Sequence, residues 1–219
     1  MTGHSFRLNQ ENLEALPSGA LWWETRQLLC VSDLHLGKSE RMARRGGALL
    51  PPYETRDTLD RLVAEINRLR PKEVVCLGDN FDDDAAGEAL HPQDRDLLIR
   101  LMAGRVWIWV AGNHDPGPID LGGENRSELH LLGLTFRHIA GNVDGFGEIS
   151  GHFHPKIRIS GESRRCFLID SNRVILPAFG TYTGGLSSHS GVLDELMGPR
   201  ALAVLTGNKI LAVPMRPGT

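Results

Sequence analysis

One stretch, VVCLGDN at residues 74–80, decides how this chain is expected to fold. Val74 to Leu77 is a short apolar run that predicts a buried strand, and Gly78 permits a sharp turn directly after it. Asp79 is then left at the carboxyl end of the strand. A carboxylate has two oxygens and can hold two cations at once, so we interpret Asp79 as a ligand shared by two metal ions.

Three other apolar runs end in the same way, with polar side chains directly after them. These runs lead into Asp33-Leu34-His35, Gly112-Asn113-His114-Asp115 and Gly151-His152-Phe153-His154. A strand, or the turn that follows it, places residues i and i+2 on one face, so Asp33 and His35 can bind one ion together. Four strand ends that carry oxygen and nitrogen ligands indicate one metal centre.

The bulk composition is that of an ordinary globular protein. The chain has 219 residues and a net charge of −3, so any anion site must be local. No apolar stretch approaches the roughly 20 residues that span a bilayer, and no secretory signal is visible. The cysteines Cys30, Cys76 and Cys166 lie in apolar runs, which favours buried thiols in a reducing cytoplasm.

The order of the apolar runs predicts an α/β fold in one domain, residues 1–219. Helical spacing over 55–69 and 92–102 alternates with strands at 74–77 and 106–110, which favours parallel pairing. Other expected elements are an edge strand at 6–8, a polar, turn-rich segment at 9–19, hairpins at 20–31 and 201–213, and a meander of short strands after residue 125. Together they predict two sheets packed face to face with helices outside.

Residues 37–52 differ in composition from the segments around them. Four basic residues lie close together there: Lys38, Arg41, Arg44 and Arg45. One interpretation is a solvated loop or short helix. The other is a basic lip over the metal site that holds a phosphate backbone. The position of the stretch, directly after the first ligand pair, is the reason to consider the second interpretation.

The candidate ligands combine carboxylate, amide and imidazole groups: Asp33, His35, Asp79, Asn113, His138, His152 and His154. Such a set suits Mn²⁺, Fe or Zn²⁺ better than Mg²⁺ or Ca²⁺, which prefer oxygen ligands. We expect two divalent ions, Mn²⁺ first, with Fe or Zn²⁺ as alternatives. His138 is the weakest member, because a single histidine in a strand is more often an ordinary core or surface residue.

Taken in this order, the motifs resemble those of the calcineurin-like metallophosphoesterases, over roughly residues 28 to 155. The resemblance implies a four-layer α/β/β/α sandwich of two mixed β-sheets. It also implies that one ion is held by Asp33, His35, Asp79 and His154. The other would be held by Asp79, Asn113, His138 and His152.

A closer resemblance is to bacterial metallophosphoesterases that are associated with DNA ligases and helicases in repair gene clusters. It rests on the segments LWW at 21–23, SDLHLGK at 32–38, GHFHP at 151–155 and PAFGTYTGGL at 177–186. It implies a cytoplasmic phosphodiesterase or nuclease of DNA repair, acting on nucleic acid or another phosphodiester, away from membranes. DNA ligase, helicase or exonuclease repair proteins would be its partners.

Two segments depart from the family pattern. Asn80-Phe81-Asp82-Asp83 lacks the arginine of the Gly-Asp-x-x-Asp-Arg segment that is common in the wider family. His138 is followed by Ile139-Ala140, where the family has an acidic residue and a proline. Neither departure removes a ligand, but both bear on how the substrate is contacted.

The ligand set and the resemblance together imply a mechanism. Two ions roughly 3.5–4 Å apart would lower the pKa of a shared water, and the bridging hydroxide would attack phosphorus in line. Asn113 would help to neutralise the developing charge. His114 would donate a proton to the leaving oxygen, with Asp115 as its orienting partner, unless His114 is only structural. Tyr182 is a candidate to stack on a base.

Two other functions fit parts of the same pattern. A nucleotide, nucleotide-sugar or lipid pyrophosphatase would use the same centre, although no apolar, membrane-seeking cap lies between the motifs. A non-catalytic, metal-binding scaffold would be expected to have lost ligands, and this sequence retains all of them.

Overall fold

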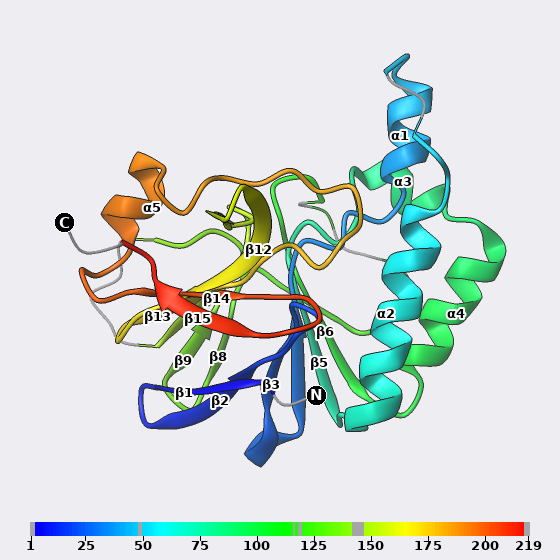
Figure 1. The fold of residues 1–219 in the computed structure, drawn as a ribbon. Helices are drawn as coiled ribbons and strands as arrows, with labels where there is room; N and C mark the ends of the chain where they lie inside the picture. The colour runs from blue at the N-terminus through cyan, green and yellow to red at the C-terminus, as the bar shows by residue number, and fades with distance from the viewer. Residues whose placement is uncertain (1–2, 48–49, 116, 118–119, 142–146, 217–219) are drawn as a thin grey trace.

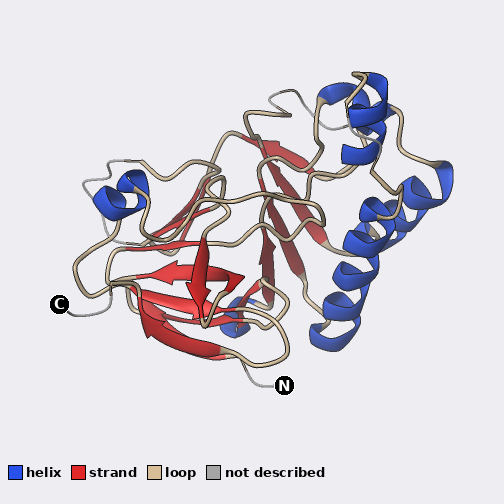
Figure 2. Cartoon of the chain, turned by 45° about the horizontal axis from the view of Figure 1, so that its top comes forward, coloured by secondary structure: helices blue, strands red, loops and turns tan. Residues whose placement is uncertain are grey.

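The computed structural model describes residues 3–47, 50–115, 117, 120–141 and 147–216. In this part of the chain two β-sheets pack against each other, and helices lie on their outer sides (Figure 1). Figure 2 shows most of the helical turns on one side of the strands and one short helix at the opposite side.

Among the described residues the first sheet has seven strands, in the order β1-β2-β3-β4-β5-β6-β7. Strands β1 to β4 pair antiparallel, and β4 to β7 pair in parallel. Their bounds are β1 His4–Leu8, β2 Glu11–Ala15, β3 Leu21–Trp23, β4 Leu28–Val31, β5 Glu73–Leu77, β6 Val106–Val110 and β7 Glu124–Arg126.

The second sheet runs in the order β15-β14-β12-β13-β10-β9-β8, with β11 paired to β12 at the side. It is mixed, because β10 pairs in parallel with both β9 and β13. Its strands are β8 Leu129–Leu131, β9 Leu134–Phe136, β10 Glu148–Ser150, β11 Lys156–Ile159, β12 Glu162–Ile169, β13 Arg173–Ile175, β14 Leu202–Leu205 and β15 Leu211–Pro214.

Two of the helices connect parallel strands, two short ones lie near the centre described below, and another lies over the second sheet. They are a 3₁₀ turn η1 Glu24–Arg26, α1 Lys38–Arg44, α2 Glu54–Leu69, α3 Asp84–Glu88, α4 Pro92–Met102 and α5 Gly191–Leu196. None of these helices in the described part of the chain is long and apolar enough to cross a membrane. Helix α4 begins with Pro92 in its first turn, where a missing N–H costs nothing.

Alternation along the strands divides the apolar side chains among three cores. Val31 and Cys76 face the helices and pack with Leu62 of α2. Cys30 faces the other way and packs with Phe136 of the second sheet. The outer face of the second sheet is covered by the α5 region, where Leu193 and Met197 belong to the third core. The four layers are therefore present. In the described residues the fourth layer consists of one short helix, α5.

The structure confirms the predicted mixed α/β sandwich and differs from the prediction in three places. The segment 9–19 contains strand β2, whose buried Leu13 and Ala15 alternate with more exposed residues. The short helices α3 and α5 were not predicted. The region after residue 125 is not a simple meander, because β10 lies between two parallel neighbours. The three cysteines are buried and free, as predicted.

Candidate metal centre

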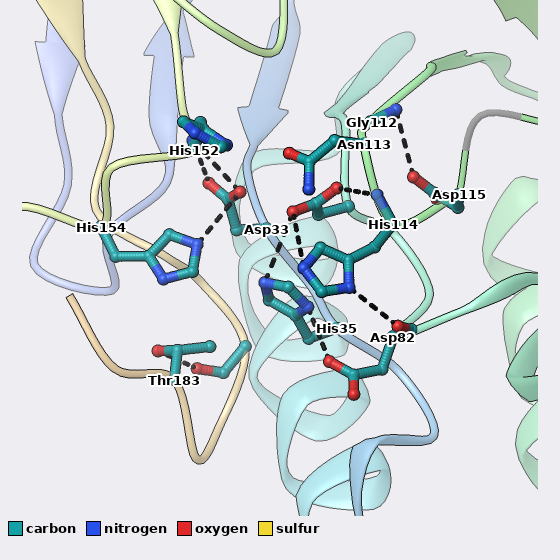
Figure 3. Close-up of polar contacts among 12 residues, drawn as sticks. Asp33, His35, Asp82, Gly112, Asn113, His114, Asp115, His152, His154 and Thr183 are labelled. Atoms are coloured by element: carbon teal, nitrogen blue, oxygen red, sulfur yellow. Dashed lines mark hydrogen bonds and ion pairs between the residues drawn. The ribbon is translucent and has the colours of Figure 1, made fainter. Parts of the chain in front are cut away.

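The candidate ligands lie where strands of both sheets end (Figure 3). In the first sheet, the parallel strands β4, β5 and β6 are followed by Asp33, Asp79 and Asn113. In the second sheet, the parallel strands β9 and β10 are followed by His138 and His152. Since the carboxyl ends of parallel strands meet at one edge of a sheet, the fold gathers these distant residues.

One group of candidate ligands comprises Asp33, His35 and His154, whose ligand atoms all lie within 4.8 Å of one another. His154 Nε2 lies 3.2 Å from Asp33 Oδ1. The Asp33 carboxylate also accepts hydrogen bonds from the Ser32 hydroxyl and from the backbone N–H of His152. These bonds fix the carboxylate in the turn after β4, where it faces His154.

A second group comprises Asp79, His138 and His152, also within 4.8 Å of one another. His138 Nε2 lies 3.3 Å from Asp79 Oδ1 and 3.2 Å from His152 Nδ1. It also lies 3.0 Å from the side-chain oxygen of Asn113. Four side-chain atoms that can each bind a metal ion therefore converge, and they include both the lone His138 and the amide that the resemblance implied.

Asp79 lies between the two groups. Its Oδ1 faces His138, and its Oδ2 lies 3.8 Å from His35 Nε2. Burial alone would raise the pKa of Asp79, but the hydrogen bond and the charge of His138 outweigh burial and lower the pKa to about 2. The carboxylate is therefore anionic near neutral pH, as a metal ligand must be.

Unpaired buried nitrogens test whether these residues fit metal ions. Among the described residues, both ring nitrogens of His35 and Nε2 of His154 are buried and have no hydrogen-bond partner. Buried polar atoms are nearly always paired, so orphaned imidazole nitrogens beside carboxylates require a partner such as a cation. The mixed oxygen and nitrogen donors suit a transition ion. The residues present therefore fit two divalent ions.

Contacts behind two of the rings orient them toward the centre. His138 Nδ1 lies 3.2 Å from the Leu77 carbonyl oxygen, which can only accept, so Nδ1 carries the proton and Nε2 is free to bind an ion. His35 Nδ1 lies within ion-pair distance of Asp82 Oδ1, at 2.9 Å, and its Nε2 lies 3.8 Å from Asp79 Oδ2. Both rings therefore present Nε2 to the centre.

Asp82 is a residue of the centre that the sequence analysis did not single out. Its buried carboxylate contacts His35, Arg41 Nη1 at 2.7 Å and Lys38 Nζ at 3.6 Å. Its backbone carbonyl lies 3.0 Å from His114 Nδ1. With His35 and His114 it forms a third group of potential ligand atoms. The available signal was its place in the acidic run that follows β5.

The Asp115 carboxylate contacts backbone groups, and its predicted role as the orienting partner of His114 stays a prediction. The carboxylate, 2% exposed, accepts backbone N–H groups from Asn80 at 2.8 Å, Phe81 at 3.2 Å and Gly112 at 3.1 Å. These donors turn it inward, where burial is the main cause that raises its pKa to about 6. Asp115 therefore ties the turn after β5 to the turn after β6.

His114 directs Nδ1 to the Asp82 carbonyl and Nε2 to the centre, 4.0 Å from Asp79 Oδ2. Its backbone N–H donates to Asp79 Oδ1 at 2.9 Å. The His114 side chain is 34% exposed, against 3% for His35. A molecule that enters the centre from solvent can therefore reach this ring.

Five of the seven candidate ligands share an unusual backbone conformation. Left-handed φ angles occur at Asp33 (53°), His35 (46°), Asp79 (46°), His152 (69°) and His154 (47°). Non-glycine residues rarely adopt this region, at a cost of about 1–3 kcal/mol each, and such strain clusters at functional sites. The strain at these five residues agrees with a functional role for this edge of the sheets.

Gly78→Ala should disturb the second ligand group. Gly78 has a φ of 73°, and a Cβ there would overlap the ring of His138. We expect a loss of roughly 1–3 kcal/mol of stability beyond that of the control, together with weaker metal binding. The matched control is Gly104→Ala, with a φ of 74° and nothing within 4 Å of the added Cβ. Equal losses in Tm with unchanged metal content would contradict the prediction.

The predicted basic lip is a helix whose side chains are paired with carboxylates. Arg41 contacts Asp82, while Arg44 Nη2 lies 3.0 Å from Asp83 Oδ1 and Arg45 Nη2 lies 3.2 Å from Asp83 Oδ2. Lysine and arginine side chains of α1 are thus close to the centre, but they face the acidic run after β5. The cationic surface expected from the sequence is therefore largely neutralised.

The late segment 177–186 runs along the ligand turns. The backbone N–H of Phe179 donates to the Ser32 carbonyl at 2.8 Å, and that of Gly180 donates to the Asp33 carbonyl at 3.0 Å. Tyr182 lies in this segment with a φ of 59° and is 38% exposed. Its ring is therefore accessible, in a segment that is anchored to the first ligand turn.

Comparison with known proteins agrees with this geometry. The model of the calcineurin-like phosphoesterase family matches residues 26–190. The crystal structure of nuclease MPE from Pseudomonas putida superposes with a TM-score of 0.76, covering 96% of this chain and 100% of that chain at 24% sequence identity, which shows a common fold. None of the curated proteins matches the chain in sequence. This protein belongs to the calcineurin-like phosphoesterase family and is a metal-dependent phosphoesterase.

Proposed function

We propose that the centre hydrolyses phosphodiester bonds of nucleic acid with two divalent ions, of which Mn²⁺ is preferred. The observation that carries the proposal is the position of Asp79, which presents one oxygen to each group of candidate ligands. One ion would be held by Asp33, His35, Asp79 and His154, and the other by Asp79, Asn113, His138 and His152.

Two divalent ions at this site would supply Lewis acidity, which lowers the pKa of water toward neutrality and offsets charge on the phosphate oxygens. The chain itself supplies the proton for the leaving group. His114 Nδ1 lies 3.0 Å from the Asp82 carbonyl oxygen, so Nε2, which faces the centre, is the ring atom that would carry the transferable proton. His114 would transfer that proton to the leaving oxygen.

The finer part of the proposal is a role in DNA repair. It is supported by the segments that resemble those of ligase-associated metallophosphoesterases and by the fold shared with a nuclease. The substrate would contact Lys38, Arg41, Arg44, Arg45 and Tyr182. DNA ligase, helicase or exonuclease repair proteins would be partners in the cytoplasm, a compartment that suits three free, buried thiols.

The test is a side-by-side assay with Mn²⁺ on three substrates: bis-p-nitrophenyl phosphate, defined DNA strands and nucleotide-sugar diphosphates. We expect turnover of the chromogenic diester and of DNA. Preferred hydrolysis of the diphosphates would replace the proposal with a pyrophosphatase. No turnover of any substrate, with both ions bound, would instead indicate a scaffold.

A further inference from the structure

One carboxylate, that of Asp83, gathers the outer arginines of helix α1. Arg44 Nη2 lies 3.0 Å from Oδ1 and 3.1 Å from Oδ2, and Arg45 Nη2 lies 3.2 Å from Oδ2. Arg41 Nε lies 3.6 Å from the same Oδ2. Two guanidinium groups therefore hydrogen-bond one anion beside the metal centre, and a third, which is bonded to Asp82, lies within ion-pair distance of it.

The neighbouring Asp82 has a different position. Its side chain is 0% exposed and is bound to His35 within the centre, so it belongs to the interior. The Asp83 side chain is 16% exposed, and those of Arg44 and Arg45 are 39% and 59% exposed. The outer cluster, formed by Asp83 with Arg44 and Arg45, is thus open to solvent and to a ligand. The contact of Asp82 with His35 is closed to both.

The chemistry of the outer cluster is that of a phosphate site. A nucleic-acid phosphodiester carries one negative charge on two non-bridging oxygens, and arginine binds carboxylate and phosphate with the same pair of parallel donors. We propose that Asp83 occupies, in the substrate-free protein, the place of a backbone phosphate among Arg41, Arg44 and Arg45. This inference deepens the proposed function, because it requires a polyanionic substrate at the metal centre.

Exchange of one anion for the other needs only side-chain movement. The first turn of α1 is fixed separately, since the N–H and hydroxyl of Ser39 donate to Glu54 Oε1 at 2.9 and 2.8 Å. Ion pairs exposed to this degree contribute roughly 0–1 kcal/mol each, so the arginines can turn from Asp83 to an incoming phosphate while Asp83 keeps its bond to the Ala86 N–H.

The exchange favours polymers over small anions. A carboxylate on the same chain competes at an effective concentration of about millimolar or more, so a free anion at lower concentration does not displace it. A nucleic acid that is already held at the metal centre brings its next phosphates at a comparable effective concentration. Asp83 would therefore keep small anions away from the arginines, and a nucleic-acid strand would displace it.

The test variant is Asp83→Asn, which removes the charge and keeps the shape. Asp83 Oδ1 also accepts the N–H of Ala86 at 2.9 Å as the N-cap of α3, and asparagine caps helices equally well. The matched control is Asp194→Asn. Asp194 lies 2.5 Å from Arg216 Nε, so this variant also removes one charge from an arginine pair, but on α5 at the opposite side of the molecule (Figure 1).

Binding is measured on the metal-loaded full chain, by fluorescence anisotropy with a single-stranded phosphorothioate oligonucleotide that resists hydrolysis. Between about 50 and 200 mM salt, Asp83→Asn should bind about three- to tenfold more tightly than wild type, with a log–log salt slope steeper by about 0.7. Adding Arg44→Ala and Arg45→Ala to Asp83→Asn should remove the gain. The control should change neither quantity.

Unchanged or weaker binding by Asp83→Asn, or an equal gain in Asp194→Asn, would overturn the proposal. Turnover of bis-p-nitrophenyl phosphate by the wild-type protein separates this result from failure of the proposed function. If the diester is hydrolysed and Asp83→Asn gains nothing, the phosphate-site inference fails alone. If neither diester nor DNA is hydrolysed but the gain appears, the anion site stands and the proposed catalysis fails.

Discussion

Asp79→Ala is expected to remove both metal ions at once and to reduce phosphodiester hydrolysis to background. The reason is geometric, since its two oxygens face different ligand groups, toward His138 on one side and His35 on the other. A bound metal ion stabilises the transition state by several kcal/mol, so loss of both ions should lower turnover by roughly 10³-fold or more.

Elemental analysis of the purified variant measures this directly. His35→Ala is the comparison, because it removes a residue of one group only and should mainly weaken one site. The bridging role of Asp79 would be wrong if Asp79→Ala retained one ion at full occupancy. Tm should be recorded for both variants, so that loss of metal is not confused with loss of the fold.

His114→Ala should lower kcat by about 10²–10⁴-fold on DNA or an alkyl phosphodiester and much less on bis-p-nitrophenyl phosphate. An alkoxide leaving group is strongly basic and needs a proton as its bond breaks, whereas p-nitrophenolate is stable as an anion. Metal content and folding should be preserved, since His114 is absent from both proposed ligand sets and its side chain is partly exposed.

Single-turnover rates on both substrates, with metal analysis, distinguish the possible roles of His114. Equal losses on the two substrates with both ions retained would exclude a leaving-group acid and favour a role in positioning phosphate. Loss of an ion would show instead that His114 supports a metal site, as its membership of the third group with Asp82 and His35 allows.

Local patterns predicted the parts of the structure that depend on local physics. Helix α4 has the predicted bounds, 92–102, because apolar spacing and an initial proline define it. The chain also ends β4, β5 and β6 where the sequence places its polar motifs. The candidate ligands then converge because parallel strands end at one edge, which follows from topology without knowledge of any contact.

Pairings between distant side chains could not be predicted in this way. Arg44 meets Asp83 across 39 positions, and Asp115 turns toward backbone N–H groups of the preceding ligand turn. Both contacts depend on which charged groups and backbone N–H groups still lack a partner after the turns have formed. The parallel pairing of β10 was missed for a similar reason, because short strands carry no local signal of their partner's direction.

The distribution of the candidate ligands over the two sheets has a consequence for how the protein unfolds. Asp33 and Asp79 follow strands of the first sheet, whereas His138, His152 and His154 follow strands of the second. An ion held by either group is released when either sheet unfolds. Its binding free energy therefore opposes unfolding of the first sheet and of the second. Metal supply would then set the cooperativity of the whole sandwich and its survival against proteases, beyond any effect on turnover.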